Sequence, residues 1–128
     1  YLQILNENNL DYREEYIIES GLNYENGEKA AHYFLSLANK PDALFVVADI
    51  FAIGILKVFK EKGVRIPQDI KIVGFDNISF SSWCNPTLTT VSQPTFKIGC
   101  SAAEMIIEKI KNKSEKRRDF ANLRRLKA

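Results

Sequence analysis

Two aspartates stand at positions from which a carboxylate could bind a small polar molecule. Asp49 and Asp76 each directly follow a short apolar run that is typical of a buried strand. An ionised carboxylate offers several acceptor sites, so it can take hydrogen bonds from neighbouring hydroxyl or N–H groups of a ligand. Parallel sheets bind ligands beyond the carboxyl ends of their strands, where both residues are expected. The pattern indicates that edge as the place for a ligand site, with Asp49 and Asp76 as its candidate residues.

Both aspartates also have a structural interpretation. Asp49 precedes a segment with helical spacing of its apolar residues, so its main expected role is to cap a helix over residues 50–62, and ligand contact comes second. Asp76 can instead bond nearby backbone amides in an Asx-turn. A phosphoacceptor role for Asp49, as in receiver domains, is disfavoured. Such domains need an acidic pair after their first strand to hold magnesium, and the first strand-like run here ends Glu19-Ser20-Gly21.

The sequence holds no pattern typical of catalysis or of metal binding. Four serines between Ser79 and Ser92 lie in no Gly-x-Ser-x-Gly motif, and the single histidine, His32, is far from them in the chain. The glycines are isolated, so no phosphate-binding loop is present. Cys84 and Cys100 are sixteen residues apart and lack the second pair that a zinc spacing requires. We expect no catalytic residue, no metal and no cofactor.

The segments that must position these residues alternate between strand and helix. In chain order we expect the end of a helix at 1–9, a short strand at 16–18, a helix at 25–39, a strand at 43–47 buried on both faces, a helix at 50–62 ending at Gly63, a turn at 67–69, a strand at 70–75, an irregular loop at 77–86, a strand at 88–91 and a helix from Pro94 to about 112. This alternation predicts an α/β fold with a mainly parallel sheet flanked by helices.

Charge is distributed unevenly along the 128 residues, whose formal net charge is +2. Residues 109–128 hold nine basic and two acidic side chains, whereas residues 1–108 hold nine basic and fourteen acidic ones. A nucleic-acid-binding surface over the whole domain is therefore not indicated.

No apolar run approaches the length of a membrane helix, and no secretory signal opens the chain. Because the chain begins without Met, we expect a fragment or a processed form. Two free thiols without an export signal fit a reducing cytoplasm.

Six short motifs follow one another between Pro41 and about Lys111. They are Pro41-Asp42-Ala43-Leu44-Phe45, Asp49-x-x-Ala52-Ile53-Gly54, Gly63-x-x-Ile66-Pro67-x-Asp69-Ile70, Ile72-Val73-Gly74-Phe75-Asp76-Asn77, Pro86-x-Leu88-Thr89-Thr90-Val91-x-Gln93-Pro94, and Gly99 with Ala102-Ala103. Each motif is weak alone, but their order and spacing together are specific. In these motifs the chain resembles the effector-binding domain of the lactose-repressor (LacI/GalR) family of bacterial transcription regulators.

The resemblance implies one lobe of a periplasmic-binding-protein-like (type I) fold, in which two α/β lobes close on a small ligand such as a sugar or a nucleobase. Residues 1–93 would form the second lobe, residues 94–112 a helix returning to the first lobe, and residues 113–128 a basic tail. The implied function is effector sensing and dimerisation in a cytoplasmic regulator that controls DNA binding allosterically. DNA would be read only by a helix-turn-helix outside this chain. The alternative is a solute-binding protein of a transport system, which shares the fold.

The resemblance also assigns site residues. The effector contacts it implies, some by position only, are Asp76, Gln93, Asp49, Trp83 and Leu22. Two of these positions depart from the family pattern, since Leu22 stands where relatives often stack an aromatic ring and Ala48 where they often carry Asn. Gln93 can equally make an ordinary strand-end hydrogen bond.

A second surface is implied for homodimer contacts. The residues expected there are Ile50, Ile53, Lys57, Phe80, Trp83 and Cys84. Ile50 and Ile53 fall on the charged side of the expected helix, and apolar residues there suggest a partner surface. Isolated exposed isoleucines are the alternative interpretation. For the basic tail, a solvated extension and binding to nucleic acid both remain open.

Overall fold

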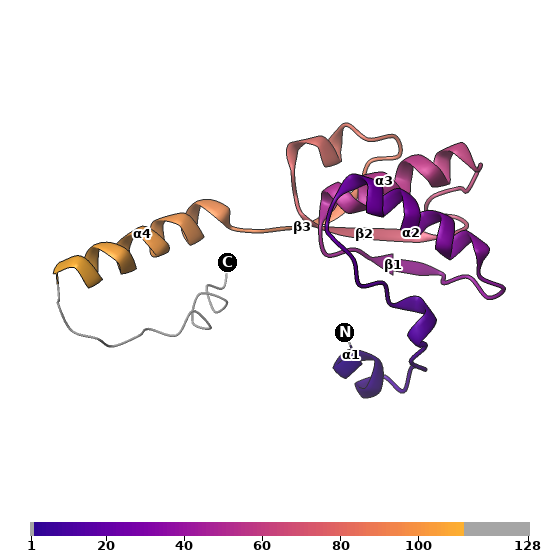
Figure 1. Ribbon diagram of the computed structural model, residues 1–128, viewed down its shortest axis with the longest axis horizontal. Helices are drawn as coiled ribbons and strands as arrows, with labels where there is room; N and C mark the ends of the chain where they lie inside the picture. Colours follow the sequence, from indigo (N-terminus) through magenta and orange to yellow (C-terminus); the bar gives the residue numbers. More distant parts are fainter. Residues whose placement is uncertain (1, 112–128) are drawn as a thin grey trace. The chain divides into compact units, whose positions relative to one another are not determined.

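The structure is a computed structural model that describes the backbone of residues 2–111 and the side chains of residues 2–110 (Figure 1). Its helices and strands follow one another as α1 (Leu2–Glu7), the 3₁₀ turn η1 (Glu14–Tyr16), α2 (Tyr24–Ser36), β1 (Ala43–Phe45), α3 (Asp49–Glu61), β2 (Lys71–Asp76), the 3₁₀ turn η2 (Ser79–Ser82), β3 (Thr89–Ser92) and α4 (Thr95–Lys111). Residues 2–92 form one compact unit and the chain from Gln93 belongs to a second. The basic tail at 113–128 lies outside the described residues.

The sheet of the first unit is parallel, as the sequence predicted. Its strands lie in the order β1-β2-β3, and both pairs run in the same direction. Phe45 of β1 pairs with Val73 of β2, and Asp76 of β2 pairs with Ser92 of β3. Because the strands are parallel, their carboxyl ends meet at one edge of the sheet. That edge is where the two singled-out aspartates were expected.

Helices α2 and α3 lie on the same side of the sheet (Figure 1). A single apolar core joins them to the strands; its members include Ala31 and Phe34 of α2, Ile55 and Phe59 of α3, and Leu44, Val46, Ile72 and Leu88 of the strands and their flanks. The apolar arc predicted for α3 is buried, and Gly63 adopts the expected left-handed conformation (φ +71°) after that helix. Burial of this arc removes apolar surface from water, which is the main favourable contribution to folding.

The two helices approach each other closely at Gly27 and Gly54. A β-carbon on Gly27 would overlap the backbone oxygen of Phe51, and one on Gly54 would overlap the backbone oxygen of Tyr24. Backbone atoms cannot move aside as a flexible side chain can. Glycine is therefore required at both positions because of the contact between α2 and α3, rather than because of a special backbone angle.

The predicted strand at 43–47 is shorter than expected, and its burial on both faces was wrong. Leu44 and Val46 are buried in the core, but Phe45 is 57% exposed and Val47 54% exposed. Side chains alternate between the faces of a strand, and the described helices of this unit that share its core, α2 and α3, cover only the face of Leu44 and Val46. The apolar run thus has one buried face and one uncovered face.

The strand predicted at 16–18 is also absent. The chain forms η1 up to Tyr16 and then continues in an extended conformation at Ile17 (φ −108°, ψ 125°), without a strand partner in residues 2–111. Two tyrosine hydroxyls fix this segment: Tyr16 donates to the carbonyl of Asn39 (3.0 Å), and Tyr33 donates to the carbonyl of Glu15 (3.0 Å). A β-prone sequence becomes a strand only where a second strand offers main-chain hydrogen bonds.

The second unit contributes α4, which begins directly after Pro94 as predicted. The amide of Ile98 donates to the carbonyl of Pro94 (3.0 Å), which places the proline at the start of the helix where its missing N–H costs nothing.

Candidate ligand-binding site

The carboxyl end of β2 has an unusual backbone. Asp76, its last residue, has φ +127°, and Asn77, the next residue, has φ +56°. Positive φ values are uncommon outside glycine and cost about 1–3 kcal/mol each, and they cluster at functional sites where the surrounding structure fixes them. The strongest sequence candidate therefore lies at the predicted edge of the sheet and in a strained turn.

Asp49 is completely buried, with none of its surface exposed. Its carboxylate accepts two hydrogen bonds, one from the hydroxyl of Thr90 (2.6 Å, to Oδ1) and one from the backbone amide of Ile78 (3.0 Å, to Oδ2). The predicted capping role was wrong: the N-cap of α3 is Ala48, and no side chain caps that end. Because both oxygens of Asp49 are used by β3 and by the loop after β2, the side chain connects these segments instead of the helix end. Its predicted effector contact is not tested by this geometry.

Thr90 completes a hydrogen-bonded group around this buried carboxylate. Its hydroxyl donates to Asp49 and also accepts from the backbone amide of Asn77 (3.2 Å). We call Asp49, Thr90 and the amides of Asn77 and Ile78 the Asp49 network. Thr90 pairs with Gly74 across β2 and β3, and a β-carbon on Gly74 would overlap Oδ1 of Asp49. The absent side chain of Gly74 thus provides the space in which the carboxylate lies.

Sequence reasoning missed Thr90 and Gly74 as site residues. The available signal was their position: both precede a strand end by two residues, on the strands that flank the predicted site. Gly74 interrupts an otherwise apolar strand, which can indicate a close approach by another group.

The loop after β2 presents aromatic side chains to solvent. Trp83 is 75% exposed and packs edge-on against the ring of Phe80, with ring centroids 6.2 Å apart. The hydroxyl of Ser81 donates to the carbonyl of Ile78 (2.6 Å), and the amide of Leu88 donates to the carbonyl of Ser81 (3.0 Å). These bonds hold the loop in place beneath its exposed rings.

Cys84 lies in this loop and is half-buried, with its thiol directed to the carbonyl of Phe80 (3.3 Å). Burial raises the pKa of the Cys84 thiol, and the nearby charge of Asp49 raises it further.

The other residues expected at an interface differ in their exposure. Ile50 is 43% exposed, as predicted, but the expectation that Ile53 is exposed was wrong, because only 8% of it is accessible. Nine of the thirteen residues of α3 are buried, since the helix packs against both α2 and the sheet, so its covered arc is wider than the sequence indicated. Lys57 pairs with Glu28 of α2 (2.5 Å), and that hydrogen bond raises the pKa of Lys57.

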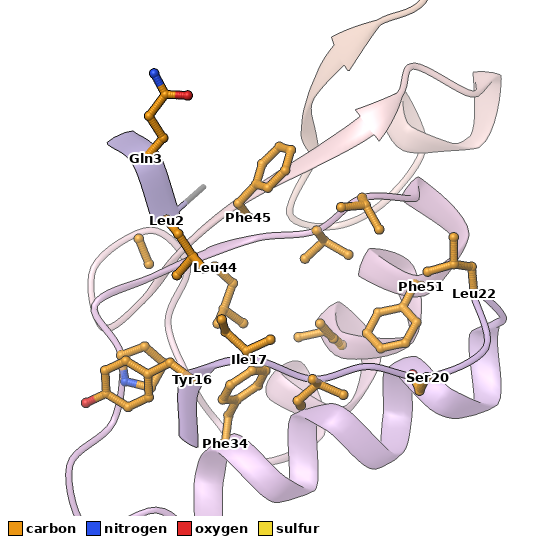
Figure 2. Close-up of a pocket in the computed structure, with 16 residues that line it drawn as sticks. Leu2, Gln3, Tyr16, Ile17, Ser20, Leu22, Phe34, Leu44, Phe45 and Phe51 are labelled. Carbon is orange, nitrogen blue, oxygen red and sulfur yellow. The ribbon is translucent and has the colours of Figure 1, made fainter. Parts of the chain in front are cut away.

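A cavity of about 590 Å³ lies elsewhere in the first unit (Figure 2). It is mostly apolar and runs between residues 16–22 and β1, touching every residue from Ala43 to Val47. Since consecutive strand residues point to opposite faces, contact with five in a row means that the cavity follows the edge of β1 opposite β2. Leu22 lines this cavity, whereas Asp76, Asp49 and Trp83 do not.

The predicted effector residues are thus only partly brought together. Asp49 and Asp76 both lie at the carboxyl edge of the sheet, and Trp83 lies on the loop that follows Asp76. Leu22 lines the apolar cavity beside β1. Gln93 follows β3 directly and opens the second unit.

Within residues 2–111, no three His, Cys, Asp or Glu side chains lie close enough together to hold a metal ion. No helix in that range is long and apolar enough to cross a membrane.

The first unit is thus a parallel sheet with helices on one face and aspartates at the carboxyl ends of its strands, and comparison with known proteins gives its family. The chain belongs to the periplasmic binding protein-like domain family, whose model matches residues 1–125. Within that family it is similar to transcription regulators of the LacI type, so the resemblance noted from its motifs is confirmed, and the fold class with it.

Three relatives illustrate the match. The chain is 36% identical over 120 residues to the HTH-type transcriptional repressor PurR of Aliivibrio salmonicida, covering 94% of this chain and 36% of that protein. The crystal structure of a LacI-type transcription regulator from Bifidobacterium animalis subsp. lactis matches 89% of this chain and 41% of its own, with a TM-score of 0.82 and 30% identity. The transcriptional regulator CelR–cellobiose complex matches 89% of this chain and 35% of its own, with a TM-score of 0.83 and 27% identity. The chain spans about a third of the length of the curated relatives it matches.

Proposed function

We propose that the chain is the effector-sensing and dimerising part of a LacI-type transcriptional regulator, in which a small molecule binds at the carboxyl edge of the sheet and changes DNA binding allosterically. The observation on which this depends most is the position of Asp76, a carboxylate at the end of the central strand in a strained turn. Strained residues at strand ends are typical of preorganised ligand sites. We infer a sugar or nucleobase effector, because vicinal hydroxyls or ring N–H groups suit a carboxylate acceptor; one structural neighbour is itself a complex with cellobiose.

The regulator is favoured over the solute-binding protein of a transport system. The curated relatives are transcriptional repressors, and the structural neighbours cited above are transcription regulators. We propose accordingly that the protein is not an enzyme, acts in the cytoplasm, and contacts DNA only through a helix-turn-helix outside these residues. Within the site, Asp76 binds the effector, Gln93 contributes from the segment after β3, and residues 1–93 and 94–112 belong to different lobes.

A homodimer surface is proposed on α3 and the loop after β2. Ile50, Phe80 and Trp83 expose apolar surface there, while Lys57 and Cys84 lie on the same two segments. Exposed aromatic rings held by a hydrogen-bonded loop are the kind of anchor that dominates protein interfaces. Ile53 is left out of this surface because it is buried.

The effector role of Asp76 is tested by titrating the 128-residue chain with cellobiose and with free nucleobases while amide NMR signals are recorded. We expect one of these compounds to shift the signals of Asp76 and its neighbours. Asp76→Asn should weaken that binding at least about tenfold, because a hydrogen bond to a charged group contributes about 1.5–3 kcal/mol. Asp42→Asn is the matched control, since Asp42 is exposed and precedes β1, at the opposite end of the strands. Equal affinity of the Asp76→Asn and Asp42→Asn variants would exclude Asp76 from the site.

The dimer surface is tested by light scattering after size-exclusion chromatography. Trp83→Glu should convert a dimer into a monomer, because a charge replaces an aromatic anchor in the proposed interface. Leu10→Glu is the control, since Leu10 is also apolar and exposed (58%) but lies in neither segment. A dimer that survives Trp83→Glu contradicts the assignment.

A further inference from the structure

We propose that Asp49 and Thr90 are positioning residues, which hold the turn at Asp76 and Asn77 in the conformation that presents the Asp76 carboxylate to an effector. This inference rests on the proposed effector role of Asp76. Neither Asp49 nor Thr90 needs to touch the effector for this purpose. Both act through the backbone of the two residues that follow Asp76.

The turn requires such support because two consecutive residues with side chains have positive φ values. A backbone in this region returns to an ordinary conformation unless the surrounding structure fixes it. Among the described residues, the side chain of Asn77 makes one hydrogen bond, from its amide to the hydroxyl of Ser92 (3.3 Å). That bond restrains the side chain of Asn77, whereas the positive φ values belong to the backbone.

The Asp49 network restrains the backbone directly. The backbone amide of Asn77 donates to Thr90, and the backbone amide of Ile78 donates to Asp49, so the two peptide groups directly after Asp76 are both fixed. Thr90 in turn donates to Asp49 at 2.6 Å, which links the two restraints into one group. Asp49 has no exposed surface, and hydrogen bonds to a buried charged acceptor are short and strong.

The arrangement also has an anchor that does not move with the turn. Asp49 is the first residue of α3, the helix at the centre of the core, and the glycine at position 74 leaves the space that its carboxylate occupies. The turn is therefore held in place by the core of the lobe and not by the loop itself. A carboxylate in ordinary helix capping would bond the amides of its own helix, and Asp49 does not.

The test compares Thr90→Val with Thr90→Ser in the 128-residue chain. Valine has the shape of threonine but lacks the hydroxyl, whereas serine keeps it. Thr89→Val is the matched control, because the same change is made one residue earlier, on the opposite side of β3. Backbone ¹³C chemical shifts report the positive φ of Asp76 and Asn77, and amide hydrogen exchange reports the bond of the Asn77 amide.

In Thr90→Val we expect the positive-φ shifts of Asp76 and Asn77 to be lost and exchange of the Asn77 amide to accelerate at least tenfold, while core amides such as that of Ile55 keep their protection. Thr90→Ser and Thr89→Val should both resemble the parent chain. Unchanged shifts in Thr90→Val would overturn the inference. If that variant does not fold, Asp49→Ala replaces it, because alanine offers the Ile78 amide no acceptor; accelerated exchange of that amide is the expected result and unchanged exchange the contrary one.

Failure of the proposed function gives a different pattern. If Asp76→Asn leaves the titration with cellobiose and nucleobases unaltered while Thr90→Val still changes the turn, the network holds a turn that binds no such ligand. If Asp76→Asn abolishes binding but Thr90→Val, with an altered turn, binds the same compound with unchanged affinity, Asp76 is the effector residue and the positioning role is wrong.

Discussion

Gly74→Ala should be unusually harmful for so small a change. In the middle of a strand, alanine is normally better than glycine by about 0.5–1 kcal/mol, because glycine loses more backbone freedom on folding. Here the added β-carbon would overlap Oδ1 of Asp49 and lie 3.0 Å from a methyl group of Leu88. Leu88 can adjust, but the carboxylate is fixed by its two hydrogen bonds.

The expected loss follows from these contacts. Overpacking a core costs about 1–3 kcal/mol, and displacing the carboxylate sacrifices at least one hydrogen bond to a charged group, which costs about 1.5–3 kcal/mol more. Subtracting the gain from alanine leaves a destabilisation of about 2–5 kcal/mol. For a unit of this size that lowers the melting temperature by at least about 8 °C. Gly99→Ala in α4 is the control; the unit to which Gly99 belongs places no atom within 4 Å of a β-carbon there, so this variant should be slightly stabilised.

A double-mutant cycle with Asp49→Ala isolates the cause. Asp49→Ala alone is destabilising, because the hydroxyl of Thr90 and the amide of Ile78 lose their acceptor. In that background the collision no longer exists, so Gly74→Ala should cost almost nothing. Urea unfolding of the four proteins should therefore give a coupling energy above about 1 kcal/mol. Additive effects, within about 0.5 kcal/mol, would refute the claim that Gly74 exists to make room for the carboxylate.

Three further predictions concern charge and thiol chemistry. The guanidinium of Arg65 lowers the pKa of Asp69 to about 2 through hydrogen bonding. This pair therefore stabilises the fold fully above the ordinary Asp pKa of 3.8, and the stabilisation is lost as the pH falls through about 2. Arg65→Gln should move the NMR titration midpoint of Asp69 back toward 3.8, and an unmoved midpoint would contradict the pairing. Cys84 should react with iodoacetamide at pH 8 more slowly than the exposed Cys100, as measured by mass spectrometry, because burial and Asp49 raise its pKa; faster labelling of Cys84 would count against that environment. The 128-residue chain should bind no duplex DNA sequence-specifically. Any salt-sensitive binding to random duplex DNA, measured by fluorescence anisotropy, should disappear when residues 114–128 are deleted. Binding that persists after the deletion excludes the basic tail as its source.

The sequence predicted the fold well because the order of apolar segments determines an α/β layer. The position of Asp76 was predictable for the same reason, since a polar residue after a buried strand must lie at the carboxyl edge of a parallel sheet. The Asp49 network was not predictable, because it joins residues 41 positions apart through a hydroxyl and two backbone amides. Periodicity identifies faces of helices and strands, but it does not show which polar side chain reaches which amide.

The errors have related causes. Ile53 was expected to be exposed because the period of a helix gives one apolar face, whereas α3 contacts both another helix and the sheet. The run at 43–47 was expected to be buried on both faces because continuously apolar strands usually are. Burial of a face, however, depends on which neighbours pack against it. The strand expected at 16–18 failed for the same reason, since its sequence suits pairing but the described residues offer it no neighbour.

The edge of β1 has a consequence for how the chain behaves at high concentration. Within the described residues, no strand pairs with β1 on the side away from β2, and Phe45 and Val47 expose apolar surface on the uncovered face next to that edge. Such an edge is a template on which the extended segment of any other molecule can form main-chain hydrogen bonds. Growth by this route is open-ended, unlike a symmetric dimer, which closes after two copies. Precipitation of the purified chain would then be governed by β1, and a lysine at position 45 or 47 is the substitution that should slow it without touching the Asp49 network.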